Sequence, residues 1–152
     1  MSNYGVQCKY TLLTGVGAFI SQTTKVFIDA DYVLGNGGVV ATIGTSMLSY
    51  LAHQYKVPVI ALCETYKFTQ RVNLDQVKNN QLFESSSIVD NSLDTTASSG
   101  KVLSQRNLKV HCLKYDFTPT KCVRMILSEI GKVSPVSVSG VVEEFNAEKG
   151  NK

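Results

Sequence analysis

A continuous apolar run at residues 57–62, followed at once by polar and aromatic residues, is the sequence feature that most constrains the fold. The run reads Val-Pro-Val-Ile-Ala-Leu and gives way to Cys-Glu-Thr-Tyr-Lys-Phe at 63–68. Uninterrupted apolar residues are typical of a strand buried within a parallel sheet. Such sheets bind their ligands beyond the carboxyl ends of the strands. We therefore expect an α/β fold whose functional surface begins directly after residue 62.

The segments before this strand predict a βαβ unit. Residues 25–30 alternate like a strand, and the apolar residues of 43–55 fall on one face of a helix. The Gly-Asn-Gly-Gly cluster at 35–38 predicts a turn, because glycine and asparagine tolerate the positive φ of a tight reversal. Strand, turn, helix and strand together form a right-handed crossover with parallel strands.

Further elements are expected on either side of this unit. Apolar residues at helical spacing predict a helix over 9–21, and 108–115 has the composition of a strand. Thr118 stands where an N-cap would, and Pro119 stands at the first helical position. These two residues predict a helix that continues through a buried face to Gly131, where glycine ends it.

Composition indicates one domain over residues 1–142, with a polar surface loop at 84–106 and a charged, frayed tail at 143–152. No stretch approaches the ~20 apolar residues of a membrane span, so we expect a cytosolic protein without membrane contact. A net charge of +3 without a basic block argues against nucleic acid as a direct ligand. The four cysteines lack Cys-x-x-Cys spacing, which favours reduced thiols and predicts no metal site.

Two clusters are candidates for a small-molecule site. The turn at 35–38 and the pair Gly44 and Thr45 can offer backbone N–H groups and a helix start to a phosphate. They match neither the dinucleotide nor the Walker pattern, so a simple tight turn is the favoured interpretation. Asp29 and Asp31 stand at the end of the first predicted strand, and we expect only one of them to reach a shared pocket.

The segment after the central strand carries the candidate partner-binding residues. Its charged residues Glu64, Lys67 and Arg71 alternate with the aromatic residues Tyr66 and Phe68. Arginine and aromatic residues are the types that anchor protein interfaces. The alternative is a polar loop whose aromatic rings only cover the edge of the sheet.

The chain resembles the C-terminal domain of the delta subunits of eukaryotic translation initiation factor 2B. The most specific part of the resemblance is the string at 63–68; the matching segments span most of the chain from Gly5 to about Val142 and are Lys25-Val26, Leu34, Asn36-Gly37, Gly44-Thr45, Val57-Pro58-Val59, Arg71-Val72, Asp75, Asn80, Tyr115-Asp116-Phe117-Thr118-Pro119 and Glu129-Ile130-Gly131. The loop at 84–106 interrupts the match.

The resemblance implies a Rossmann-like α/β domain, a parallel sheet flanked by helices that lacks the first strands of the family's sheet. It implies a non-catalytic role in the guanine nucleotide exchange factor for translation initiation factor 2, with no cofactor and no enzyme activity. The implied partners are the alpha and beta subunits of initiation factor 2B and initiation factor 2 itself. We accordingly expect an oligomer that works in the cytoplasm.

The wider superfamily also contains sugar-phosphate isomerases, which supply the alternative function. Their strand-end aspartate falls on Asp31, and the remains of their pocket would include Asn36, Gly37, Gly44 and Thr45. The isomerases follow the turn with an Asn-Lys pair that helps to grip phosphate, where this chain has alanine and threonine at 41–42. Their catalytic cysteine matches no position here. An aspartate without these groups does not make a proton shuttle.

Overall fold

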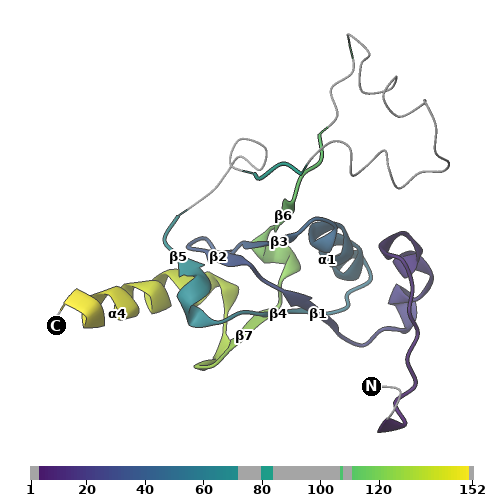
Figure 1. Ribbon diagram of the computed structural model, residues 1–152. Coiled ribbons are helices and arrows are strands. Elements are labelled where there is room, and N and C mark those ends of the chain that lie inside the picture. Colours follow the sequence, from purple (N-terminus) through teal and green to yellow (C-terminus); the bar gives the residue numbers. More distant parts are fainter. Residues whose placement is uncertain (1–3, 72–79, 84–106, 108–110, 151–152) are drawn as a thin grey trace.

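The computed structural model describes residues 4–71, 80–83, 107 and 111–150, and these residues build two four-stranded sheets (Figure 1). Sheet A has the order β1 (Val26–Asp29), β4 (Val59–Leu62), β7 (Met125–Ser128) and β8 (Gly131–Val133). Sheet B has the order β5 (Phe68–Thr69), β2 (Tyr32–Leu34), β3 (Val39–Thr42) and β6 (Tyr115–Thr118). The α-helices of this part of the chain are α1 (Thr45–Gln54) and α4 (Val138–Gly150); in Figure 1, α4 lies at the left and α1 lies to the right of the centre. Neither is long and apolar enough to cross a bilayer.

The parallel centre of sheet A confirms the predicted α/β fold and its crossover. Strand β1 pairs in parallel with β4, and β4 pairs in parallel with β7. Helix α1 lies in the connection between β1 and β4 and packs against both strands. Strand β4, which contains most of the apolar run, therefore lies between two parallel strands. Its carboxyl end opens at one end of the sheet, as the sequence predicts.

One face of sheet A forms the core. Along β1, Val26 and Ile28 are buried, whereas Phe27 between them is 58% exposed. This alternation follows from the twofold period of a strand. Helix α1 contributes Ala52 to the same core, and α4 contributes apolar residues from its first turns.

The predicted turn at 35–38 is confirmed, but it closes a hairpin instead of leading from β1 directly to α1. It connects the antiparallel strands β2 and β3, where Gly37 has φ +78° and its N–H donates to the Leu34 carbonyl at 2.8 Å. A hairpin is therefore inserted between β1 and α1. Its strands contain three and four residues, too few to show a hydrophobic period, so the sequence predicted the turn but neither strand.

The predicted helix from Thr118 to Gly131 is wrong. Thr118 ends β6, which pairs with β3, and the following residues form the short 3-10 helix η5 (Thr120–Cys122) and then β7 and β8. The apolar spacing of this segment fits either a helix or a short buried strand. The segment forms a strand because β7 pairs in parallel with β4. Gly131, with φ +109°, does not end a helix but begins β8.

Both ends of the chain also differ from expectation. In place of a helix over 9–21, the chain forms the 3-10 helices η2 (Leu13–Ala18) and η3 (Ile20–Gln22), consistent with the weakening of an α-helix by Gly15 and Gly17. At the other end α4 extends to Gly150, so the residues expected to fray from 143 are helical. The expected strand at 108–115 lies partly, and the loop at 84–106 wholly, outside the described residues.

Candidate functional site

The segment 64–71 leaves the carboxyl end of β4, where the sequence places the functional surface. It contains the 3-10 helix η4 (Thr65–Lys67) and then β5, which adds to the edge of sheet B by pairing in parallel with β2. The segment thus crosses from one sheet to the other. We call residues 64–71 the η4 loop.

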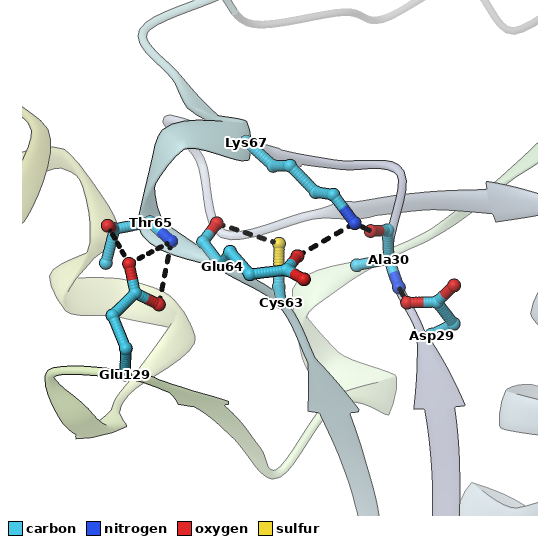
Figure 2. Close-up of polar contacts among 7 residues, drawn as sticks. All are labelled: Asp29, Ala30, Cys63, Glu64, Thr65, Lys67 and Glu129. Atoms are coloured by element: carbon cyan, nitrogen blue, oxygen red, sulfur yellow. Dashed lines mark hydrogen bonds and ion pairs between the residues drawn. The ribbon is translucent and has the colours of Figure 1, made fainter.

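One side of the η4 loop is tied to the end of β1 through Lys67. Its Nζ lies 2.8 Å from the Glu64 carboxylate and donates a hydrogen bond to the Ala30 carbonyl at 3.2 Å (Figure 2). The hydrogen bond between the two side chains lowers the pKa of Glu64 and raises the pKa of Lys67. Both groups therefore stay charged across the physiological range, and the tie persists there.

The other side of the loop is tied to the turn between β7 and β8. The N–H of Thr65 donates to both carboxylate oxygens of Glu129, at 3.0 and 3.1 Å, and the Thr65 hydroxyl donates to the same group (Figure 2). These hydrogen bonds lower the pKa of Glu129. The loop is therefore attached to the ends of two strands, β1 and β7, that flank its own strand in sheet A.

The predicted partner-binding residues divide into two groups. Glu64 and Lys67 bond to each other, and Phe68 packs against the core, so these three hold the loop in place. Tyr66 is 79% exposed and Arg71 is also exposed. These two side chains are exposed and take no part in the hydrogen bonds that anchor the loop, although Lys67 Nζ lies 5.9 Å from the centre of the Tyr66 ring.

Cys63, at the base of the loop, is unsuited to covalent catalysis. Its side chain is buried, and its Sγ donates to the Glu64 carbonyl at 3.4 Å (Figure 2). Burial raises the pKa of the thiol to about 12. Because the thiolate is the nucleophilic form, Cys63 is an inert structural thiol at neutral pH.

A broad cleft of about 1060 Å³ opens between the η4 loop and sheet B. Asp31 lines it, together with Tyr66, Lys67 and Arg71 of the loop. Asp29 does not line the cleft. Its carboxylate accepts a hydrogen bond from the Ala30 N–H at 2.8 Å, a structural role that is common for an aspartate at the end of a strand. Asp31 is thus the member of the pair that reaches a cavity.

The other residues of the expected sugar-phosphate pocket do not line this cleft. The Asn36 carboxamide oxygen accepts from the Gly38 N–H at 3.0 Å, within the hairpin turn. A Cβ on Gly37 would lie 2.1 Å from the Pro135 carbonyl oxygen, so its backbone is packed against a neighbouring segment. The structure therefore separates Asp31 from the turn with which it was grouped.

The N-terminus of α1, which holds Gly44 and Thr45, is filled by a side chain of the protein itself. The Asp116 carboxylate on β6 accepts hydrogen bonds from the N–H groups of Gly44 at 2.7 Å and Ser46 at 3.0 Å. The Ser46 hydroxyl also donates to the Phe117 carbonyl at 2.7 Å. These are the N–H groups that a bound phosphate would use, and they are already satisfied.

Sequence analysis missed Asp116 and Glu129 as structural carboxylates. Burial raises the pKa of Asp116, and the hydrogen bonds from Ser46 and Gly44 lower it in part. Each carboxylate contacts backbone more than 60 residues away along the chain, so no local pattern reports the contact. Assigning 115–118 to a strand would have placed Asp116 beside α1.

Comparison with known proteins agrees with this architecture. The model of the initiation factor 2 subunit family matches residues 1–135. The delta subunit of translation initiation factor eIF2B from Schizosaccharomyces pombe is 34% identical over 149 residues, which are 95% of this chain and 32% of the relative. The Dictyostelium discoideum delta subunit is 38% identical over 149 residues, 95% of this chain and 24% of the relative. The chain thus spans a third or less of these relatives.

Isomerases lie at a greater distance. Ribose 1,5-bisphosphate isomerase from Pyrococcus furiosus is 26% identical over 145 residues, 95% of this chain and 42% of the relative.

Among solved structures, a chain of the tetrameric eIF2B-beta2-delta2 complex from C. thermophilum superposes with a TM-score of 0.63 at 23% identity, covering 94% of this chain and 38% of that one. The 5-methylthioribose 1-phosphate isomerase of Pyrococcus horikoshii OT3 gives 0.69 at 20% identity, covering 96% and 39%. These two superpositions show a shared fold.

The predicted resemblance is confirmed at the level of the family, since its model covers all of the described sheets up to the start of α4. The chain belongs to the initiation factor 2 subunit family.

Proposed function

We propose that this chain is a non-catalytic regulatory domain of the guanine nucleotide exchange factor for translation initiation factor 2. It acts in the cytoplasm by assembling with the alpha and beta subunits of initiation factor 2B and by contacting initiation factor 2. The two delta subunits that match nearly the whole chain support this assignment. A regulatory domain of this kind works through its surface, and so the rigidity and exposure of its surface residues matter most.

The η4 loop is the observation that carries the proposal. Its backbone is held by Glu129 on one side and, through Lys67, by the Ala30 carbonyl on the other, while Tyr66 and Arg71 remain exposed. A side chain on a preorganised backbone loses less entropy on binding than one on a flexible loop. Tyrosine and arginine are also the types most often found at the energetic centre of interfaces.

The geometry around α1 disfavours catalysis on a sugar phosphate. Asp116 occupies the N–H groups at the helix start, and Cys63, at the base of the η4 loop, stays protonated at neutral pH. Ala41, which stands in the position of the isomerases' asparagine, is 2% exposed and offers no polar side chain. These features favour binding over catalysis.

A sugar-phosphate isomerase or a sugar-phosphate-binding protein remains the second candidate, because Asp31 does line the cleft and Lys67 lies with it. The two candidates give opposite results with ribose 1,5-bisphosphate and methylthioribose 1-phosphate. We expect no turnover of either compound by NMR and no binding isotherm by calorimetry. A binding isotherm that Asp31→Asn abolishes would establish the second candidate.

The test of the first candidate uses Tyr66→Ala and Arg71→Ala in the chain co-expressed with the alpha and beta subunits. Losing one central interface anchor commonly costs about 2 kcal/mol, or roughly a thirtyfold loss of affinity. Tyr10→Ala is the matched control, since Tyr10 is 99% exposed and lies far from the loop in the sequence. Unchanged affinity together with a lowered melting temperature would mean that the loop only covers the edge of the sheet and does not bind the partner.

A further inference from the structure

A second groove lies at the opposite edge of sheet A from the η4 loop. It is about 650 Å³ in volume and runs past the amino ends of β4 and β7 and the C-terminal end of α1. Pro58 and Val59 from the first strand and Arg124 before the second form part of its wall. Because it lies at the amino ends of the strands, it shares no lining residue with the cleft around Asp31.

The charged residues that line the groove all carry the same sign. Lys56 follows the end of α1, Lys121 comes from η5, and Arg124 comes from the segment between η5 and β7. All three are exposed, as is the neighbouring His53, and no aspartate or glutamate is among the described residues of the lining. None of these residues takes part in the ion pair between Glu64 and Lys67 on the η4 loop.

Helix chemistry accounts for only part of this cluster. A cation near the last turn of a helix is favoured by the helix dipole, which explains Lys56. Lys121 and Arg124 belong to other elements, so the dipole gives no reason for them to converge there. Lys121 instead lies with its Nζ 5.5 Å from the centre of the ring of Tyr50 on α1, a cation-π contact.

The backbone under the groove is firmly set. Lys56 has φ +58°, a left-handed conformation that is uncommon for a residue with a side chain, and its N–H donates to the His53 carbonyl at 3.0 Å. The Val57 N–H donates to the Ala52 carbonyl and the Arg124 N–H to the Val59 carbonyl, both at 2.8 Å. The cations therefore project from a rigid frame.

The bottom of the groove is apolar. Val57, Val59, Val123 and Pro135 are buried there, and Val136 at the rim is 78% exposed. An exposed valine beside a cationic rim offers apolar contact and charge together. A ligand that fits must therefore carry negative charges flanking at least one apolar side chain.

We propose that this basic groove docks an acidic peptide segment of a partner protein, with carboxylates on Lys56, Lys121 and Arg124 and an apolar side chain against Val136. Nucleic acid fits less well, because binding of single strands relies on aromatic side chains for base stacking, and no Phe, Tyr or Trp is among the described lining residues. The inference is independent of the η4 loop and of the function proposed above.

The test measures fluorescence anisotropy with a fluorescein-labelled octapeptide, Glu-Glu-Leu-Glu-Glu-Val-Glu-Glu, at low and at physiological ionic strength. The double variant Lys121→Glu with Arg124→Glu should weaken binding about tenfold or more, since reversed rim charges repel the peptide. The matched control is Lys9→Glu with Lys132→Glu, which changes the net charge equally at exposed positions outside the groove. Melting temperatures of all three proteins establish that each is folded.

The docking site is supported if the control variant loses less than about twofold in affinity while the groove variant loses about tenfold or more. Weaker binding after Val136→Ser, with its charges intact, supports the apolar contact. Equal losses in both double variants would overturn the proposal in favour of non-specific attraction. Tighter binding of labelled oligouridylate than of the octapeptide would overturn it in favour of nucleic acid, and an unbound octapeptide at low ionic strength would overturn it outright.

Discussion

The start of α1 and the η4 loop are each tied by a carboxylate from a distant part of the chain, yet they leave different groups exposed. At the start of α1, the Asp116 carboxylate accepts hydrogen bonds from the backbone N–H groups of Gly44 and Ser46. In the η4 loop, the Glu129 carboxylate accepts a hydrogen bond from the backbone N–H of Thr65, while the side chains of Tyr66 and Arg71 are exposed to solvent. The first region has its N–H groups occupied, whereas the second leaves two side chains exposed on an anchored backbone.

The difference shows how one fold can serve catalysis or recognition. A helix start at the edge of a parallel sheet is a ready-made anion site, provided that its N–H groups are free. Here an internal carboxylate takes the place of the ligand, so the same helix start contributes to stability. In the proposed function, binding then depends on side chains at the neighbouring strand end. Mutation of the carboxylate in each region tests this comparison, and we expect the larger loss of stability at the start of α1.

The start of α1 should be the more sensitive to mutation. Asp116→Ala removes the acceptor for two backbone N–H groups, and loss of such a cap costs about 1–2 kcal/mol of unfolding free energy. For a domain of this size that is roughly 2–8 °C in melting temperature, measurable by calorimetry. Asp29→Ala is the control, because its carboxylate accepts from the adjacent Ala30 N–H and is exposed. Equal losses in the two variants would mean that Asp116 is an ordinary surface carboxylate.

The η4 loop should respond in its local dynamics. Glu129→Ala removes the acceptor of the Thr65 N–H and hydroxyl, so amide hydrogen exchange at 64–68 should accelerate while the melting temperature falls less than in Asp116→Ala. Partner affinity should also fall, because the loop is no longer preorganised. Glu143→Ala, at an exposed position on α4, is the matched control. Unchanged exchange in Glu129→Ala would show that the loop needs no anchor.

How much of this was predictable depends on how local the determining interactions are. The strand at 57–62 was predicted from its continuous apolar run, and the helix after Gly44 from its helical period. Strands β2, β3, β7 and β8 contain only three or four residues each, and β2, β3 and β7 also pair with strands that are distant in the sequence. The apolar residues from Cys122 to Ile130 fit a helix equally well, and only the pairing with β4 excludes it.

The same reasoning applies to the site. The position of the η4 loop at the carboxyl end of β4 was predicted, because it depends only on the sequence of strand and loop. The division of its residues into anchors and exposed side chains was not, because Glu129 reaches Thr65 across 64 positions of the chain. The grouping of Asp31 with Asn36 and Gly37 failed for the related reason that an unrecognised hairpin separates them.

The smallest expected effect is a pH dependence that separates Asp116 from an ordinary cap. Burial raises its pKa in the folded protein above that of the unfolded chain, where an aspartate titrates near 3.9. The folded state then binds the proton more tightly, so the contribution of Asp116 to stability is fully present below the unfolded pKa and declines as pH rises through the folded pKa. Asp116→Asn keeps an oxygen acceptor and cannot titrate. The melting temperature of the wild type minus that of Asp116→Asn should therefore fall with rising pH across this window and then level off, and a difference that rises instead would show that hydrogen bonds from Gly44 and Ser46 outweigh burial.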